Sequence, residues 1–354
     1  MTSSAALEAR PRGGPSAGRL ARRHGWTVGV YVLLLLLLLY WQTIPAHWGS
    51  FDVQSLAIDA LPLAFAAMAQ SVVIISGGID LSVGSLISLV NVVSAKYMID
   101  MGFRNALLFG ALLLLGSAAA GAFTGSLIVL TRVPDIVVTL AMLFVWAGLA
   151  LEILQIPGGG APAQYLQLGT GHWWSQWIPS GLVILLLAYA IFWLPLRWAR
   201  PGLALYSIGS NRNAAYLSGV GVARTRIFAY ALGGLFCGLA GLSLSATSGI
   251  GDPSAGQYYT LNSVAAAVLG GVLLIGGVGG LIGPIAAAFV VTLVKTILIL
   301  KGVDQNWAQV IQGTLIIVVV MIGGLAIRQR RRTRESNSLR DISLASNWRP
   351  PIPF

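Results

Sequence analysis

The chain has 354 residues, of which 56% are hydrophobic and only 9% are charged, and its net charge is +11. A soluble domain carries about a quarter charged residues, so this composition excludes an ordinary soluble protein and indicates an integral membrane protein. Apolar stretches of roughly 17–25 residues recur along the chain, each long enough to cross a hydrocarbon core of ~30 Å as a helix. Because the long Leu, Val and Ile runs lack the alternation of a transmembrane barrel, we expect an all-α protein. The single cysteine, Cys237, excludes a disulfide framework.

The first 25 residues form a polar, basic tail. The apolar run that follows is too long for a signal-peptide core and lacks a small-residue cleavage site, so we predict that it is the first span. Ten spans are expected, at residues 26–44, 53–76, 82–99, 105–130, 134–156, 178–196, 227–247, 259–275, 281–300 and 307–327. Residues 26–327 would thus be the membrane domain, and residues 328–354 a second basic tail.

The basic residues support an even number of spans. All but four of the 22 Lys and Arg residues fall on the side that holds both tails, the turn at Arg132 and the segment 197–226. The exceptions are Lys96, Arg104, Lys295 and Lys301. Cytoplasmic loops carry the excess of basic residues, so both termini are predicted to be cytoplasmic. The positive charge therefore reflects membrane topology, and no nucleic-acid partner is expected.

The segment 197–226 carries five arginines and no acidic residue, and it lies between two apolar runs. Ser210 or Asn211 is expected to cap a short helix over residues 211–218, and Gly219 to end it. The helix presents small side chains at Ala214, Ala215 and Ser218. Such a helix on the basic side is either a docking element for another protein or part of a solvated loop.

Two glycine-rich segments interrupt the helical pattern. The first reads SGGIDLSVGS at residues 76–85 and contains Gly77, Gly78, Asp80, Ser82 and Gly84. The second reads GGVLLIGGVGGLIGP at residues 270–284 and contains Gly276, Gly277, Gly279 and Gly283. Glycine allows the backbone to unwind, and irregular backbone at membrane depth survives only beside protein or a water-filled cavity. Paired breaks of this kind indicate a translocation pathway; the alternative is two short cytoplasmic turns with close packing.

Polar side chains within the expected spans are few. We expect Asp80 to accept amide hydrogen bonds at the start of the third span, in preference to relaying protons. Candidates for contact with a solute in the pathway are Phe65, Gln70, Asn91, Trp146 and Asn262. The neutral amides among them would either bind a polyol or tie one helix to another. With so little fixed charge at membrane depth, a neutral, hydroxyl-rich solute that packs on aromatic rings is favoured.

The sequence lacks the residues that several other classes of function require. The sequence contains no GxxxxGKS/T motif, so the chain is not expected to hold nucleotide phosphates. The three histidines, His24, His47 and His172, lie in the tail or outer loops, and we assign no metal site or catalytic triad to them. A membrane enzyme is therefore disfavoured. An ion- or proton-coupled secondary carrier stays open, with Asp80 or Glu152 as its ion site.

Three motifs carry a resemblance to a known family. SGGIDLSVGS at residues 76–85, GSNRNAAYLSGV at residues 209–220 and AAAVLGGVLLIGGVGGLIGP at residues 265–284 resemble, in order, the signatures of ribose-type permeases of bacterial ABC sugar importers. The match covers about residues 55–325 and leaves out both tails. The resemblance implies a permease of about ten transmembrane helices in the bacterial inner membrane, with a fold similar to that of cobalamin-type ABC importer permeases.

The resemblance also implies partners and a mechanism. It places the loop between the sixth and seventh spans, here Asn211 to Gly219, against a cytoplasmic ATPase that uses ATP and Mg²⁺, while this chain binds no cofactor and is not an enzyme. A periplasmic or lipid-anchored sugar-binding protein would deliver a neutral monosaccharide or similar polyol. A second permease, identical or homologous, would complete a pathway in which the helices around residues 77–84 and 276–283 reorient. The sequence does not identify the sugar.

Overall fold

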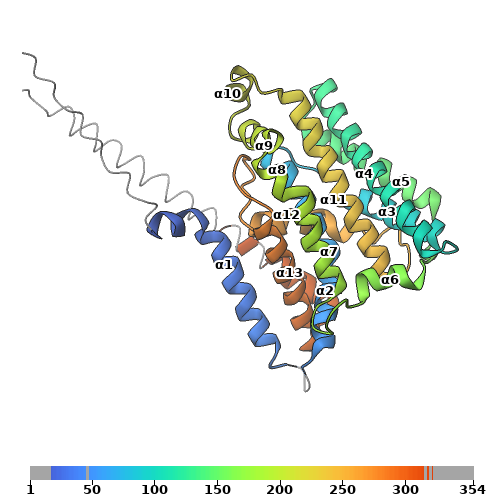
Figure 1. Cartoon of the computed structure of the whole chain (residues 1–354). Helices are drawn as coiled ribbons and strands as arrows, with labels where there is room; N and C mark the ends of the chain where they lie inside the picture. Colours follow the sequence, from blue (N-terminus) through green and yellow to red (C-terminus); the bar gives the residue numbers. More distant parts are fainter. Residues whose placement is uncertain (1–16, 45–47, 315–316, 319–320, 322–354) are drawn as a thin grey trace, which may run out of the picture.

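The computed structural model describes residues 17–44, 48–314, 317–318 and 321. Every regular element in this part of the chain is helical, as the sequence predicts (Figure 1). Two isolated β-bridges, Gly158 with Gly251 and His172 with Pro179, join connecting segments. Residues 1–16 of the predicted N-terminal tail and the whole predicted C-terminal tail, residues 328–354, lie outside the described residues. The rest of the N-terminal tail, residues 17–25, is helical and begins α1.

The helices follow one another with short connections. The first group is α1 (Ala17–Trp41), α2 (Ser50–Ile75), α3 (Val83–Met98), α4 (Phe103–Thr131) and α5 (Asp135–Ile153). The second is α6 (Ala163–Thr170), α7 (Ser180–Ala188), the π-helical turn η1 (Tyr189–Trp193), α8 (Leu194–Trp198), α9 (Arg200–Ser210) and α10 (Arg212–Leu217). The third is α11 (Val222–Ser248), α12 (Gln257–Leu269) and α13 (Ile282–Leu300). Residues 305–314 form a further helical stretch.

Six helices in the described residues are long and apolar enough to cross a membrane: Ser50–Ile75, Phe103–Thr131, Asp135–Ile153, the continuous run Ser180–Trp198, Val222–Ser248 and Ile282–Leu300. Gly25–Trp41 and Val83–Met98 are shorter apolar helices. The protein is therefore a multi-pass helical membrane protein. These helices coincide with the predicted spans except for the eighth and the tenth, and the tenth lies partly outside the described residues.

The eighth predicted span is not a full-length helix, which corrects the sequence analysis. α12 has 13 residues and ends at Leu269, so at 1.5 Å per residue it is about 20 Å long, less than the ~30 Å hydrocarbon core. Residues 270–275, the rest of the predicted span, are not helical and belong to the second glycine-rich segment. The chain before α12 runs along α3. Asn91 Oδ1 accepts from the N–H of Asp252 at 2.8 Å, and Ser88 Oγ accepts from the N–H of Gly256 at 2.8 Å. These two contacts bring the first turn of α12 beside α3.

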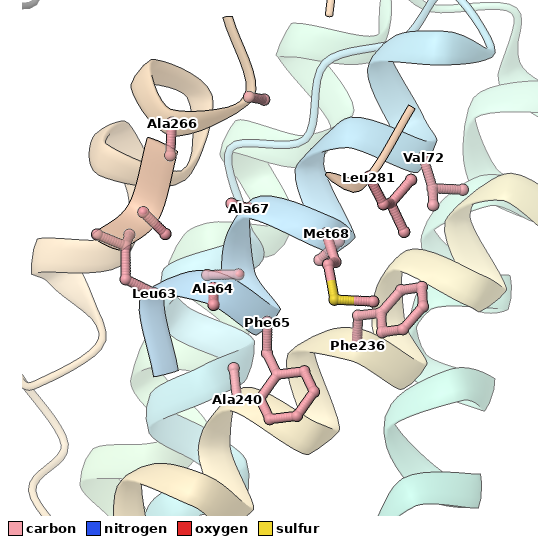
Figure 2. Close-up of a cluster of buried hydrophobic side chains, with 14 of the residues drawn as sticks. Leu63, Ala64, Phe65, Ala67, Met68, Val72, Phe236, Ala240, Ala266 and Leu281 are labelled. Carbon is pink, nitrogen blue, oxygen red and sulfur yellow. The ribbon is translucent and has the colours of Figure 1, made fainter. Parts of the chain in front are cut away.

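The helix α2 is the centre of the packing. Every residue from Ala60 to Ile75 is buried, as expected of a helix that is hydrophobic all round. Phe65 and Met68 pack with Phe236 of α11 in the main apolar core (Figure 2). By contrast, α4 and α5 expose large apolar side chains along most of their length, as lipid-facing helices do. The central position of α2 brings both of its ends into contact with the segments described next.

The connecting segments gather at two ends of the bundle. At the α6 end, the rings of Trp48 and Trp177 lie 5.4 Å apart, so the connections before α2 and α7 are neighbours. Gly158 pairs with Gly251, so the connections before α6 and α12 are neighbours as well. The opposite end carries α9 and α10 (Figure 1). We call it the α10 end.

Candidate functional site

Three segments that are remote in sequence meet at the α10 end. They are the first break, residues 76–82, the end of α9, and the second break, residues 270–281. The N–H of Gly277 donates to the carbonyl of Ile75 at 2.9 Å, which ties the second break to the end of α2. A Cβ on Gly276 would lie 2.9 Å from the Cα of Gly77, and a Cβ on Gly77 would lie 3.5 Å from the Cα of Gly209. We call Gly77, Gly209, Gly276 and Gly277 the glycine junction.

Close backbone approach is what requires glycine at the junction. A Cβ on Gly209 would overlap the carbonyl oxygen of Ile75, and Gly276 adopts a φ of +91°, which L side chains rarely adopt. Each of the three motifs in the sequence contributes to this contact. The sequence therefore located the breaks, and the structure shows that they touch each other through α9.

The helix α9 also holds the second break with side chains. The Tyr206 hydroxyl donates to the carbonyl of Gly279 at 2.9 Å, and Ser210 lies against Gly277. We had expected one short helix in the segment 197–226, and α9 is a second one. Pro201 in its first turn favours this start, because its fixed φ suits a helix and the missing N–H needs no partner there.

The short helix α10 follows the junction directly. Asn211 Oδ1 accepts from the N–H of Ala214 at 3.0 Å, so Asn211 caps α10 as expected, and Gly219 has the left-handed φ of a helix end. Ala215 is buried within this chain, whereas Ala214 and Ser218 are exposed.

The most exposed apolar side chains of α10 were missed by the sequence analysis. Tyr216 is 71% exposed and Leu217 is 84% exposed. The signal that identifies them is their position as the two large apolar residues of the predicted short helix on the arginine-rich side.

A charged cluster supports the first break. Arg226 of α11 forms an ion pair with Asp135 at the start of α5, and the Tyr230 hydroxyl donates to the same carboxylate at 2.9 Å. The side chains of the ion pair are only 11% and 17% exposed. A Cβ on Gly78 would lie 2.7 Å from both the Asp135 carboxylate and the Tyr230 hydroxyl. The cluster thus joins α5, α11 and the first break.

The charged cluster was not predicted. The sequence analysis assigned Arg226 to a loop, but α11 begins at Val222, so Arg226 lies in its first turns. Arg226 and Asp135 are 91 residues apart, and no local pattern pairs residues at such a separation.

Asp80 lies buried within the first break. Its Oδ1 accepts from the backbone N–H of Ser82 at 2.8 Å and from the Ser82 hydroxyl at 2.6 Å. The helix α3 begins at Val83, so these bonds shape the turn before the helix and do not cap its first N–H groups. Gly84 lies inside α3, against Gly256.

The other site glycines lie at contacts between helices. Gly283 lies in the first turn of α13, against Gly270 at the end of α12. Gly270, where the second break begins, is therefore in close backbone contact with Gly283, just after the second break ends.

The five proposed pathway residues do not form one site. Phe65 packs in the core, Asn91 is hydrogen-bonded to Ser245 and Asp252, and the Asn262 amide bonds within α12 and to Gln312. Trp146 packs against the core from α5. Gln70 is fully buried, and neither of its amide atoms has a partner in the described part of the chain. Of the five, only Gln70 and Trp146 therefore have buried polar atoms without any hydrogen-bond partner in the described residues.

A cavity of about 420 Å³ lies between α2, α11, α12 and α13. Its polar lining includes Asp59, Thr247, Ser248, Tyr258, Tyr259 and Lys295. None of the five proposed pathway residues lines it. Among the described residues, no group of three or more His, Cys, Asp or Glu side chains is placed to hold a metal ion.

Helices interrupted at glycine, a polar cavity among them and an exposed short helix at one end define the class of protein as a membrane permease. Residues 53–320 match the family described as branched-chain amino acid transport system / permease component, and the chain belongs to this family. It is thus a permease component and not a catalytic subunit.

Curated relatives resemble the chain over most of its length. It is 31% identical to the fructose import permease protein of Rhizobium meliloti over 305 residues, which are 83% of this chain and 84% of the relative. It is 31% identical to the ribose import permease protein of Escherichia coli over 306 residues, 82% of this chain and 91% of the relative. The autoinducer 2 import system permease protein of Yersinia pseudotuberculosis is 28% identical over 335 residues, 90% of this chain and 99% of the relative. No solved structure matches the chain significantly.

Proposed function

We propose that this chain is the permease subunit of an ATP-driven ABC importer, and that it carries a neutral monosaccharide or similar polyol by alternating access. Relatives named for the import of ribose and fructose support the substrate class. The cavity between α2, α11, α12 and α13 supports it as well, because hydroxyl and aromatic side chains form much of its lining.

The proposal includes a topology and a set of partners. Ten spans, with a fold similar to that of cobalamin-type importer permeases, would leave both termini and the α10 end in the cytoplasm of a bacterium. A second permease, identical or homologous, would share the pathway, and a periplasmic or lipid-anchored binding protein would dock at the α6 end. ATP and Mg²⁺ would be used by a separate ATPase.

The observation that carries the proposal is the position of α10 immediately after the glycine junction. Gly209 touches the first break and Gly277 of the second break, and α10 begins three residues later at Arg212. A displacement of α10 would therefore be transmitted directly to the backbone of both breaks. The contacts are backbone to backbone, so little of the displacement is absorbed by side-chain rearrangement.

The ATPase contact of α10 is tested at its exposed tip. Substituting Ala215, the one buried residue of α10, would disturb the fold itself, so the test uses Tyr216→Ala and Leu217→Ala. Each anchor at an interface typically contributes about 2 kcal/mol, so co-purification of the ATPase should weaken roughly 30-fold per substitution. Phe51→Ala is the matched control, because Phe51 is 76% exposed but lies at the start of α2. Normal ATPase capture by both tip variants would overturn the docking assignment.

The second candidate function is an ion- or proton-coupled carrier that works without an ATPase. It would use Asp80 or Glu152. Asp80 is already hydrogen-bonded twice to Ser82, and Glu152 is exposed at the end of α5. Solute uptake into proteoliposomes that hold the permease and an ion gradient, without ATPase or ATP, would favour this carrier.

A further inference from the structure

We infer that the cavity between α2, α11, α12 and α13 is a binding site for the solute, in which Asp59 and Lys295 bind hydroxyl groups of a neutral polyol. This inference rests on the proposed function. It begins from the position of the two charges, since Asp59 lies within α2 and Lys295 within α13, both of them long enough to span a membrane. A charged side chain at membrane depth costs several kcal/mol unless it faces water or a polar partner, and such residues mark solute pathways.

Neither charge forms a close ion pair with a protein partner in the described residues. The only ion pair there is the one between Arg226 and Asp135. Lys295 Nζ lies 5.0 Å from the ring centroid of Tyr258, a cation–π contact that leaves its N–H groups able to donate. The Asp59 carboxylate has no hydrogen bond within the same part of the chain. One strong acceptor and one strong donor therefore face the same cavity.

A proline adds a backbone acceptor beside Asp59. Pro62 lies inside α2 and has no N–H, so the carbonyl of Ile58 lacks its usual helical donor. Ile58 and Pro62 both line the cavity. The helix α2 thus offers a carboxylate and a carbonyl on neighbouring residues.

The opposite wall supplies aromatic surface. Tyr258 and Tyr259 lie in the first turn of α12, with ring centroids 5.3 Å apart in an edge-to-face arrangement. The Tyr258 hydroxyl accepts from Gln312 Nε2 at 3.4 Å, which holds the ring in place. Their position depends on the connection before α12, residues 249–256, which sets this first turn beside the cavity. Ring faces of this kind pack against the C–H surface of a sugar.

The combination favours a neutral polyol over charged solutes. A carboxylate accepts from two hydroxyl groups at once, and an ammonium donates to a third. A sugar phosphate would bring its anion beside Asp59. A zwitterionic amino acid would satisfy both charges, but its aliphatic side chain would not use the hydroxyl group of Thr292, which also lines the cavity.

The first test measures occupancy and does not depend on transport. The sequence contains one cysteine, Cys237, which is buried, so Ser248→Cys introduces one exposed thiol at the cavity. In the reconstituted assembly with its binding protein, ribose and fructose are used as neutral probes, leucine as a zwitterion and ribose 5-phosphate as an anion. Ribose or fructose should slow alkylation by a membrane-impermeant maleimide several-fold. Ser254→Cys, an exposed position outside the cavity, should be unaffected by any of the four.

The second test separates binding from turnover. Asp59→Asn and Lys295→Met should each raise the KM for the imported sugar about tenfold or more, because each removes a charge-assisted hydrogen bond, while ATPase subunits still co-purify. Asp100→Asn and Lys301→Met are matched controls, since both residues are exposed and neither lines the cavity.

The outcomes distinguish the inference from the proposed function. Normal sugar import with an unchanged KM in both Asp59→Asn and Lys295→Met would overturn the inference and leave the proposed function standing. Protection by leucine alone, or by ribose 5-phosphate alone, would overturn the neutral-polyol assignment. Protection of Ser248→Cys by ribose or fructose with raised KM values would support it.

Discussion

The two glycine breaks differ in how they are held. The first break is mostly buried, with a single left-handed residue at Gly77, and polar side chains fix it from three sides: Asp80 within it, and Asp135 and Tyr230 beneath Gly78. The second break contains several left-handed glycines, at Gly271, Gly276, Gly277 and Gly279. It also exposes apolar residues at Leu274, Ile275 and Val278, of which Ile275 is 74% exposed.

The difference indicates a division of roles. A buried segment fixed by charged hydrogen bonds opens only at high free energy, whereas an exposed segment held by backbone contacts opens more readily. We therefore expect the first break to act as a fixed support, and the second to change shape when α10 is displaced. The three predictions below challenge this comparison, beginning with the largest expected effect.

Breaking the ion pair should damage the first break most. Asp135→Asn and Arg226→Met should each destabilise the permease by about 3–5 kcal/mol, because each leaves the other charge largely buried without a counter-charge. Thermal unfolding of the purified permease measures this. The double variant should lose clearly less than the sum of the single variants, since it leaves no unpaired charge.

The surface arginine Arg224 supplies the control for the ion pair. Arg224→Met lies on the same helix but is exposed, so its effect should stay within about 0.5 kcal/mol. Strict additivity of Asp135→Asn and Arg226→Met would show that the pair does not act as a unit.

The second-largest loss of stability is expected from a methyl group added at the glycine junction, within the second break. Gly276→Ala forces a strained φ and a contact 2.9 Å from Gly77, which together should destabilise by about 2–4 kcal/mol. Gly280→Ala is the control within the same break, because a Cβ there meets nothing within 4 Å. Midpoint temperatures and the number of ATP molecules hydrolysed per solute imported should both change for Gly276→Ala only. Equal midpoint temperatures and equal ATP use per solute for Gly276→Ala and Gly280→Ala would contradict the role assigned to Gly276 in the junction.

Substitutions of Asp80 should have the smallest effect on stability, and they test how the first break is held. Asp80→Asn keeps an acceptor for the N–H of Ser82 and should preserve most transport. Asp80→Leu leaves that buried N–H unpaired and should destabilise by about 1–3 kcal/mol. Transport rates across a pH series check the assignment, since a titration that disappears in Asp80→Asn would mean that Asp80 exchanges protons and would revive the carrier.

Local chemistry explains why much of the protein was predictable. Spans with long apolar runs, such as α2 and α4, are visible because their length matches the bilayer. The cap at Asn211 and the helix end at Gly219 follow from the residue types alone. The eighth span failed because hydropathy does not distinguish a full helix from a half-length helix such as α12 followed by an apolar, glycine-rich irregular segment.

By itself, the sequence determined an all-helical membrane protein, the positions of its two breaks and the presence of a short helix on its basic side, since hydropathy, glycine content and capping act over a few residues. Only the tertiary structure decided that Gly77, Gly209 and Gly276 touch, that Arg226 pairs with Asp135, and that Asp59 and Lys295 share a cavity. Each of these contacts joins segments separated by tens to hundreds of residues. The packing of α2 against its neighbours brings the segments together, and no local pattern encodes that packing.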